Sequence, residues 1–261
     1  MTRSDVTPTP WTLLRRLTPA RIALGRAGSS LPTAPHLEFQ LAHARARKAV
    51  HLGLDVPALR AELAPLGLPV QELASAADSR ATYLQRPDLG RRLDAPSRDA
   101  LSQVPGGCDL AIVIGDGLSA LAIQTNAAPF LTLALPIVQA QGLTVGPVSI
   151  VTQARVAIGD QIGAALGAQM VLVLIGERPG LSSPDSMGLY LTYGPKAGLT
   201  DESRNCISNV RSAGLSFPEA AQKLVFLLTQ ARQLGLSGIH LKDEAETLAP
   251  AEPRPNFLIE T

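Results

Sequence analysis

The sequence predicts an α/β fold in which an N-terminal helical segment is followed by a Rossmann-like parallel-sheet domain. Three short, nearly continuous apolar stretches carry this prediction: DLAIVIGDG, PVSIVTQA and MVLVLIGE, at residues 109–117, 147–154 and 170–177. Strands with such patterns are buried on both faces. Helix-like runs follow the first two stretches, and strands that alternate with helices form a parallel sheet through right-handed crossovers.

The first half of the chain has the pattern of helices and turns. In LEFQLAHARARKAVHL, Leu37, Leu41 and Ala44 recur at helical spacing. We expect a helix here that begins after Pro35 and is capped by Gly53, because proline suits helix entry and glycine suits helix exit.

Three further elements complete the expected secondary structure. The segment PALRAELAPLG predicts a short helix closed by Gly67, and the apolar run Leu189–Tyr193 predicts another strand. The segment Pro218–Gly235 predicts a long late helix, with proline at its start and glycine at its end.

These elements divide the chain into four parts. We expect an N-terminal tail at residues 1–16, a helical N-terminal domain at 17–104, a Rossmann-like domain at 105–248 and a C-terminal tail at 249–261. The last part contains the proline-rich sequence AEPRP, which is typical of a surface tail.

The charge balance gives no general signal for a nucleic acid or a membrane. The chain carries 23 Lys and Arg against 22 Asp and Glu, so its formal net charge is +1. The first 60 residues hold nine of the basic residues and three of the acidic ones. With few aromatic residues to stack on bases, such a segment favours an acidic protein partner or solvent over DNA.

Cysteine and apolar patterns predict a cytoplasmic protein. Cys108 and Cys206 lie far apart and form no disulfide framework, so reduced thiols are expected. The longest apolar run, Ala127–Val138, is interrupted by Thr132 and Pro136, and we expect it to be too short to span a bilayer.

One motif is typical of oxidoreductases that bind a dinucleotide. Residues 115–120, GDGLSA, match the dinucleotide pattern G-x-G-x-x-G/A between a strand and a helix. That pattern also needs an acidic residue near the end of the next strand, and no Asp or Glu occurs from Gly117 to Gly159. A tight turn with Asp116 at a helix N-terminus is the favoured interpretation, and binding of NAD at the Gly115-Asp116-Gly117 turn stays an alternative.

Three loops are expected to open onto one crevice. The turn at Gly115–Gly117, the pair Arg155-Val156 and the pair Glu177-Arg178 each follow a predicted strand. Ligands of open α/β sheets bind at the carboxyl ends of strands. Glu177 and Arg178 are equally consistent with a solvated turn.

Other motifs predict little chemistry. His36, His43 and His51 are spaced 7 and 8 residues apart, which is not the spacing of a helical metal pair, so we expect no metal site. Cys206, in RNCISN, is by composition expected to be a small buried apolar residue.

The order of these segments resembles the small-subunit family of ethanolamine ammonia-lyase. The resemblance runs from Leu17 to about Asp243 and is carried by TPARIALGRAGSSLPT, YLQRPDLGRRLD, DLAIVIGDGLSALA, VTQARVAIGDQIGAALGA, LIGERPGLSSPDSMGLYLTYGP and ESRNCISNVR. No single segment is a general motif, but their order and near full-length coverage make the match specific.

The resemblance implies an adenosylcobalamin-dependent enzyme that converts ethanolamine to acetaldehyde and ammonia by a radical path. It implies that a large TIM-barrel subunit holds the substrate and that the small subunit closes over the cobalamin from the other side. In this sequence, Val156, Glu177 and Cys206 match cobalamin-contacting positions of the family. Glu177 would accept hydrogen bonds from the cofactor, while Val156 and Cys206 would contribute packing or backbone groups.

The resemblance also bears on the form of the cofactor and on location. Some cobalamin mutases supply an axial histidine from a D-x-H-x-x-G loop, and this chain has no such loop, so the cofactor should keep its own dimethylbenzimidazole on cobalt. Encapsulation in a bacterial microcompartment stays open, as does the alternative of a non-catalytic scaffold module. We expect no catalytic residue in this chain.

Overall fold

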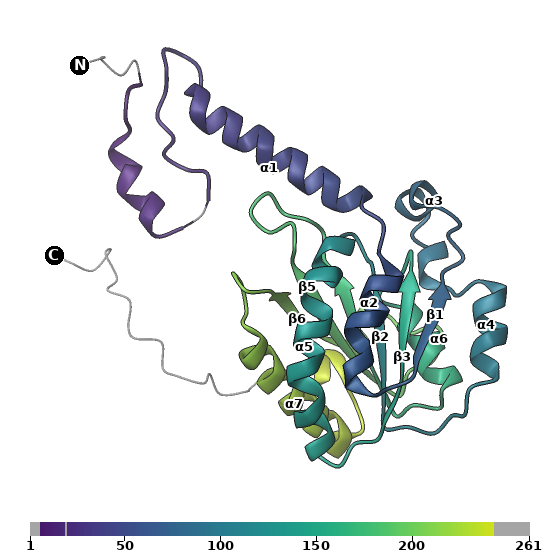
Figure 1. Cartoon of the computed structure of the whole chain (residues 1–261). Coiled ribbons are helices and arrows are strands. Elements are labelled where there is room, and N and C mark those ends of the chain that lie inside the picture. The colour runs from purple at the N-terminus through teal and green to yellow at the C-terminus, as the bar shows by residue number, and fades with distance from the viewer. Residues whose placement is uncertain (1–5, 19, 243–261) are drawn as a thin grey trace.

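A computed structural model describes residues 6–18 and 20–242, and its centre is a six-stranded sheet (Figure 1). The strand order is β1-β3-β2-β4-β5-β6. The strands are β1 (Val70–Ala74), β2 (Leu110–Gly115), β3 (Val145–Thr152), β4 (Met170–Gly176), β5 (Met187–Tyr193) and β6 (Arg204–Val210). The first four in this spatial order pair in parallel, and β5 is antiparallel to both β4 and β6.

Helices cover both faces of the sheet. The α-helices are α1 (Thr33–His51), α2 (Val56–Leu63), α3 (Arg80–Gln85), α4 (Ala95–Ser102), α5 (Ala120–Ala140), α6 (Ile158–Ala165) and α7 (Phe217–Leu234). The described residues also form 3-10 segments at Pro10–Arg16, Ala64–Leu66, Leu89–Arg91, Asp201–Ser203 and Gly238–His240. Side chains of α2, α5 and α7 form the core on one face, and those of α4 and α6 form it on the other.

The central strands confirm the prediction of an α/β fold with strands buried on both faces. Every residue of β2 and of β4 is buried. Along β2, Ile112 and Ile114 face the cluster that contains α5, while Ala111 and Val113 face the cluster that contains α6. This alternation follows from the period of two in a strand.

The predicted parallel pairing does not extend to one end of the sheet. Strand β5 contains the predicted Leu189–Tyr193 but pairs antiparallel with β4. The connection between them is the loop at residues 177–186, which is too short for the crossover that parallel neighbours need. Strand β1 was not predicted, because its segment lies among helices and turns.

The helix ends agree in part with the sequence prediction. Pro35 lies inside the first turn of α1 instead of before it, and Leu52, not Gly53, caps that helix. The segment after α2 ends at Gly67, and α7 ends at Gly235, each with a positive φ of 70° and 67°. These two glycines confirm the expected caps, because the left-handed conformation favours glycine.

Helix α5 is longer than its sequence indicated. It runs unbroken through Pro129 and Pro136 and is long and apolar enough to cross a membrane by length and composition. The apolar run Ala127–Val138 is thus only part of a longer apolar helix. In the described structure α5 instead packs against the sheet and α7 as a core helix, and 56% of its most apolar window is buried.

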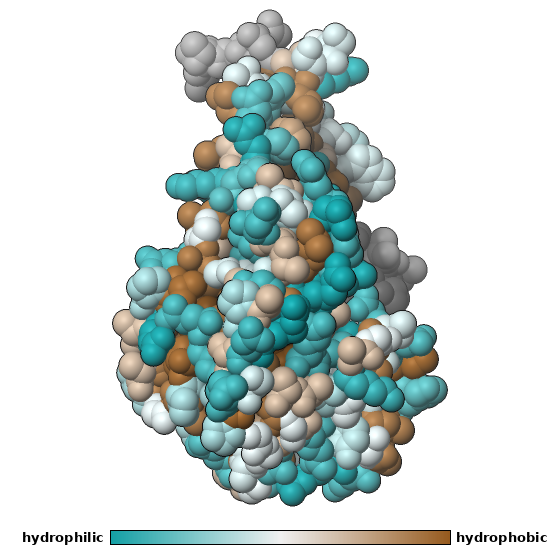
Figure 2. Space-filling model, turned by 90° about the vertical axis from the view of Figure 1, so that its right-hand side faces the viewer, coloured by the Kyte–Doolittle hydropathy of each residue, from teal (hydrophilic) through white to brown (hydrophobic). Residues whose placement is uncertain are grey.

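An N-terminal arm, defined here as residues 6–32 without residue 19, extends with α1 beyond the sheet domain (Figures 1 and 2). Within α1 only Ala42, Ala46 and Ala49 are buried. Large apolar side chains on the arm and on α1 are exposed, among them those of Trp11, Leu13, Leu17, Leu31, Leu37 and Leu41. Figure 2 shows apolar and hydrophilic residues interspersed on this projecting part.

Candidate functional site

A pocket of about 440 Å³ lies at the carboxyl ends of β2, β3 and β4. Its walls include Gly117 and Leu118 after β2, Arg155 and Val156 after β3, and Glu177 and Arg178 after β4. The loops after β2 and β3 lead to helices on opposite faces, α5 and α6, which opens a crevice between them. The three predicted loops therefore meet at one site.

A close approach of two backbone segments forms the base of the pocket. The Leu118 amide donates a hydrogen bond to the Gly176 carbonyl at 2.9 Å. Gly117 has a φ of +56°, and a Cβ placed there would collide with the Gly176 carbonyl. A Cβ at Gly176 would in turn collide with the Ser119 carbonyl. Glycine is needed at both positions for this packing, so the glycine pattern has a structural cause.

Asp116 ties the loops after β2 and β3 together. Its carboxylate accepts hydrogen bonds from the amides of Gln153 at 3.0 Å and Ala154 at 2.9 Å. Burial raises the pKa of Asp116, and these two amides and Arg80, at 3.6 Å, oppose that rise. The N-cap of α5 is Ser119, so the placement of Asp116 at the helix N-terminus was wrong.

A buried tyrosine lies under two arginines beside the pocket. Tyr83 is fully buried, and its hydroxyl donates to the Ala154 carbonyl at 3.1 Å. The guanidinium carbon of Arg155 lies 4.3 Å from the ring centroid, and that of Arg80 lies 4.6 Å from it. Burial raises the pKa of Tyr83 to about 12. Arg80 and Tyr83 lie one turn apart in α3, whereas Arg155 reaches Tyr83 from the loop after β3. Sequence reasoning missed both contacts.

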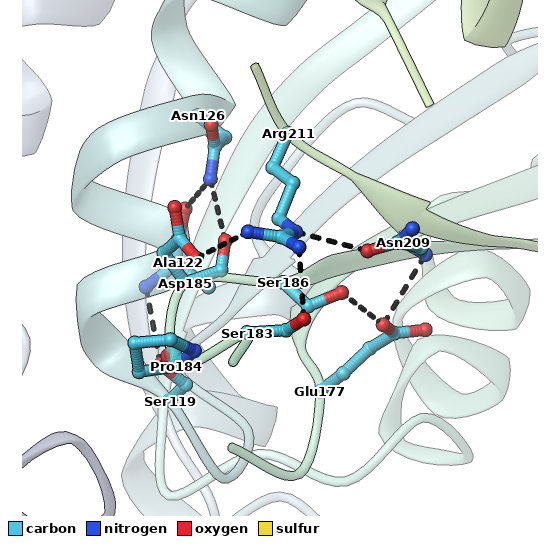
Figure 3. A network of polar contacts seen from close by, with 10 residues as sticks. All are labelled: Ser119, Ala122, Asn126, Glu177, Ser183, Pro184, Asp185, Ser186, Asn209 and Arg211. Atoms are coloured by element: carbon cyan, nitrogen blue, oxygen red, sulfur yellow. Dashed lines mark hydrogen bonds and ion pairs between the residues drawn. The ribbon is translucent and has the colours of Figure 1, made fainter. Parts of the chain in front are cut away.

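Glu177 is the centre of a polar network that joins three strands (Figure 3). Its carboxylate accepts hydrogen bonds from the Ser208 hydroxyl at 2.6 Å, from the Asn209 amide at 3.2 Å and from the Ser186 hydroxyl. Its own amide donates to the Ser186 carbonyl at 2.9 Å. The sequence was equally consistent with Glu177 in a solvated turn, but its carboxylate is hydrogen-bonded within the protein.

Arg211 extends this network into the loop at residues 177–186. Its Nε donates to Asn209 Oδ1 at 3.0 Å, its Nη2 donates to the Ser183 hydroxyl at 2.8 Å, and its Nη1 pairs with Asp185 at 3.2 Å. Asn209 has a φ of +59°, in the left-handed region that Asn tolerates better than most residues. Figure 3 shows Arg211 reaching from the β6 side toward the loop.

The same loop is held from the other side by α5. The Asn126 side-chain amide donates to the Asp185 carbonyl at 2.9 Å, and the Ser119 hydroxyl donates to the Pro184 carbonyl at 2.7 Å. The loop at residues 177–186 is thus fixed between α5 and the end of β6, which fixes the wall of the pocket that contains Glu177.

Cys206 lies at the edge of the site and is exposed, so the expectation of a buried apolar cysteine was wrong. It pairs across the sheet with Tyr190, a residue of the pocket wall. The structure therefore places Val156 and Glu177 in the pocket and Cys206 beside it. Within the described residues, no three His, Cys, Asp or Glu side chains come together as a metal site.

Comparison with known proteins identifies the family of this chain. The family model of the ethanolamine ammonia-lyase light chain (EutC) matches residues 8–242. The chain belongs to this family. The ethanolamine ammonia-lyase small subunit of Ralstonia nicotianae is 55% identical over 263 residues, which cover 99% of this chain and 97% of the relative. The small subunit of Azotobacter vinelandii is 58% identical over 248 residues, with coverage of 94% and 92%.

Membership in the ethanolamine ammonia-lyase light-chain family makes this chain a component of an ammonia-lyase, a carbon–nitrogen lyase built from unlike subunits. A small subunit implies a large-subunit partner. The family also implies a coenzyme B12-dependent enzyme.

The residues of the pocket fit part of such a cofactor. The walls combine apolar groups, such as Val156 and Ile175, with charged ones, and the buried Nε of Arg155 has no hydrogen-bond partner within the described residues. The volume of about 440 Å³ suits a drug-sized ligand, and a corrinoid is much larger. The pocket alone would therefore enclose only part of a corrinoid.

Proposed function

We propose that this chain binds adenosylcobalamin in the pocket between β2, β3 and β4 and acts with a large TIM-barrel subunit to convert ethanolamine to acetaldehyde and ammonia. The observation that carries the proposal is the convergence of Val156, Glu177 and the Cys206–Tyr190 pair around one pocket in a chain of this family. When bound, the cofactor supplies a radical by homolysis of its cobalt–carbon bond.

Each residue of the pocket would then make a different contact with the cofactor. Val156 gives an apolar contact, and Tyr190 and its cross-strand neighbour Cys206 lie on the face of β5 and β6 opposite α7. A carboxylate has about four acceptor positions, and Glu177 uses three for protein donors, which leaves it one position for an amide of the cofactor. Its main work is to fix the pocket wall.

We assign the reacting groups and most of the ethanolamine contacts to the large subunit, with no catalytic residue in this chain. The carboxylate of Glu177 is engaged by three donors, and burial raises the pKa of both Tyr83 and Tyr190. A phenol with a raised pKa is not a proton acceptor at neutral pH, so neither tyrosine serves as a general base. Turnover should therefore require both subunits, in the cytoplasm or inside a bacterial microcompartment.

The N-terminal arm and α1 provide the proposed contact surface for the large subunit. They expose apolar side chains, including Trp11 and Leu13. They also carry several arginines, which packing in a protein core does not explain. The arm also touches the pocket loop, because Arg21 donates to the Ser182 hydroxyl at 3.4 Å. A partner bound to the arm would therefore lie close to the cofactor pocket.

Deletion of residues 6–32 tests this contact surface. The deletion leaves α2 intact, whose Leu59 and Leu63 belong to the core, so the sheet domain should still fold. We expect loss of co-purification with the large subunit while the far-ultraviolet circular dichroism of the remaining helices and strands is retained. Unchanged assembly would refute the role of the arm.

Co-expression with the large subunit tests the function itself. The isolated chain should release no acetaldehyde, and the reconstituted complex should bind cobalamin and release acetaldehyde and ammonia from ethanolamine. A chain that produced acetaldehyde alone with cobalamin would contradict the division of labour. A complex without cobalamin-dependent activity would favour the scaffold alternative.

The oxidoreductase alternative has a separate test. The turn at Gly115–Gly117 is engaged internally, because Leu118 donates to Gly176 and the Ser119 hydroxyl donates to Pro184. The Leu118 amide is therefore already used within the protein and is not free to bind a pyrophosphate at the start of α5. Titration with NAD should therefore give no saturable binding, and tight binding would support the alternative.

A further inference from the structure

Arg155 has an unsatisfied hydrogen-bond donor at the pocket. Four buried side-chain polar atoms in the described residues lack a hydrogen-bond partner: Arg80 Nη2, Ser149 Oγ, Arg155 Nε and Arg204 Nε. Of these residues, only Arg155 belongs to the pocket wall. A buried guanidinium donor without a partner is costly, so a partner that arrives with the ligand would be stabilising.

The position of Arg155 is fixed from several sides. Its backbone amide donates to the Gly90 carbonyl at 2.8 Å, and its Nη2 reaches the Tyr83 carbonyl at 3.4 Å. The guanidinium lies over the Tyr83 ring, with its central carbon 4.3 Å from the centroid. A planar, stacked guanidinium is pre-organised for a charged acceptor with two oxygens.

The charged side chains of the pocket wall are two arginines and one glutamate, so their summed charge is positive. Glu177 is the acidic residue of the pocket wall, and three protein donors surround its carboxylate. Arg178 in the same wall is exposed and makes no ion pair or hydrogen bond with any described residue. Arg155 and Arg178 therefore present two cations to the ligand, and an anionic group is the complementary chemistry.

We propose that Arg155 binds a phosphodiester of the pocket's ligand, with Arg178 adding long-range attraction. This inference rests on the proposed function, under which the anion is the phosphodiester that joins the corrin side chain to the nucleotide tail of adenosylcobalamin. The neutral amides of the corrin ring give no comparable charge complementarity. Arg155 is thus a ligand-binding residue, and Tyr83 is the positioning residue beneath it.

The test compares corrinoids with and without the phosphate on the complex with the large subunit. Equilibrium binding of adenosylcobalamin and of cobinamide, which lacks the phosphate, ribose and base, is measured for wild type, Arg155→Gln and Arg155→Lys. Arg232→Gln, an exposed arginine on α7, is the matched control. Spectrophotometric titration reads binding directly, without turnover.

We expect Arg155→Gln to weaken adenosylcobalamin binding about tenfold to a hundredfold and cobinamide binding by less than about twofold. Arg155→Lys should give an intermediate loss for adenosylcobalamin, because lysine keeps the charge but not the planar fork. Equal losses for both corrinoids would assign Arg155 to the corrin amides and overturn the inference, as would no loss for either.

A wild-type comparison keeps the inference testable if the variants fail to assemble. Cobinamide phosphate should bind the wild-type complex at least about tenfold more tightly than cobinamide, and equal affinities would overturn the inference. A wild-type complex that bound no corrinoid would refute the proposed function as well. Cobalamin binding that is insensitive to the phosphate would refute only the role of Arg155.

Discussion

Asp160 and Arg204 form a buried, bidentate ion pair that joins α6 to β6. The two hydrogen bonds measure 2.6 and 2.7 Å, and the side chains are 3% and 2% exposed. The Arg204 guanidinium also donates to the Thr192 hydroxyl at 3.1 Å. The pair thus anchors the antiparallel end of the sheet to the helix that follows the pocket loop containing Val156.

Asp160→Ala should strongly destabilise the fold. Removal of one partner of a buried ion pair leaves the other charge uncompensated and typically costs about 3–5 kcal/mol in the free energy of unfolding. Urea denaturation measures this change. Asp88→Ala is the control, because Asp88 pairs with Arg86 at 2.8 Å on the surface, where an ion pair contributes little. Equal effects of the two substitutions would contradict the importance of burial.

Glu177→Ala should weaken cofactor binding without changing the chemistry. The substitution removes the acceptor for Ser186, Ser208 and the Asn209 amide, and so loosens the pocket wall. We expect the apparent Kd for adenosylcobalamin to rise about tenfold to a hundredfold. Turnover at saturating cofactor and the KM for ethanolamine should change little. Normal binding with lost turnover would instead place Glu177 in the chemistry.

Arg211→Ala should release the loop at residues 177–186. Asp185 and Ser183 lose their guanidinium partner, while Asn126 and Ser119 still hold the loop from α5. Hydrogen exchange at residues 178–186 should become faster, and exchange in β2 should not change. Arg211→Lys should restore part of the protection, since it keeps the charge opposite Asp185. Unaltered exchange in the loop would show that α5 alone is sufficient.

The stabilising effect of Asp109 should depend on pH. Hydrogen bonds from the Thr144 hydroxyl and amide, both at 2.7 Å, hold the pKa of Asp109 below its ordinary value near 4. A carboxylate with a lowered pKa stabilises the fold above its unfolded-state pKa, and the effect disappears as the pH falls through the folded-state value. Wild type should therefore exceed Asp109→Ala in stability at pH 7, and the difference should shrink below about pH 4. A constant difference in urea denaturation would contradict this explanation.

The sequence predicted the central part of the fold and of the site. The apolar runs of β2, β3 and β4 identify buried strands, and their loops carry Val156 and Glu177 to one edge of the sheet. Gly67 and Gly235 marked helix ends because left-handed conformations favour glycine. These signals are local, so each can be read within a short stretch of chain.

The exposure of Cys206 could not be predicted from its local sequence. Composition favours burial for a cysteine, yet α7 covers only one face of β5 and β6, and Cys206 lies on the other. Strand β1 was missed for a related reason, because it is a strand only through its pairing with β3, more than 70 residues later. Which face a helix covers depends on packing between distant segments.

By itself, the sequence determined the family, the buried strands and the three loops that meet at the pocket, because each depends on the order and type of neighbouring residues. Only the tertiary structure decided the antiparallel end of the sheet, the clamp made by Asp116 and the stacking of Arg155 on Tyr83. These features depend on contacts between residues far apart in the chain, whose free energies are set by burial and geometry in the folded state.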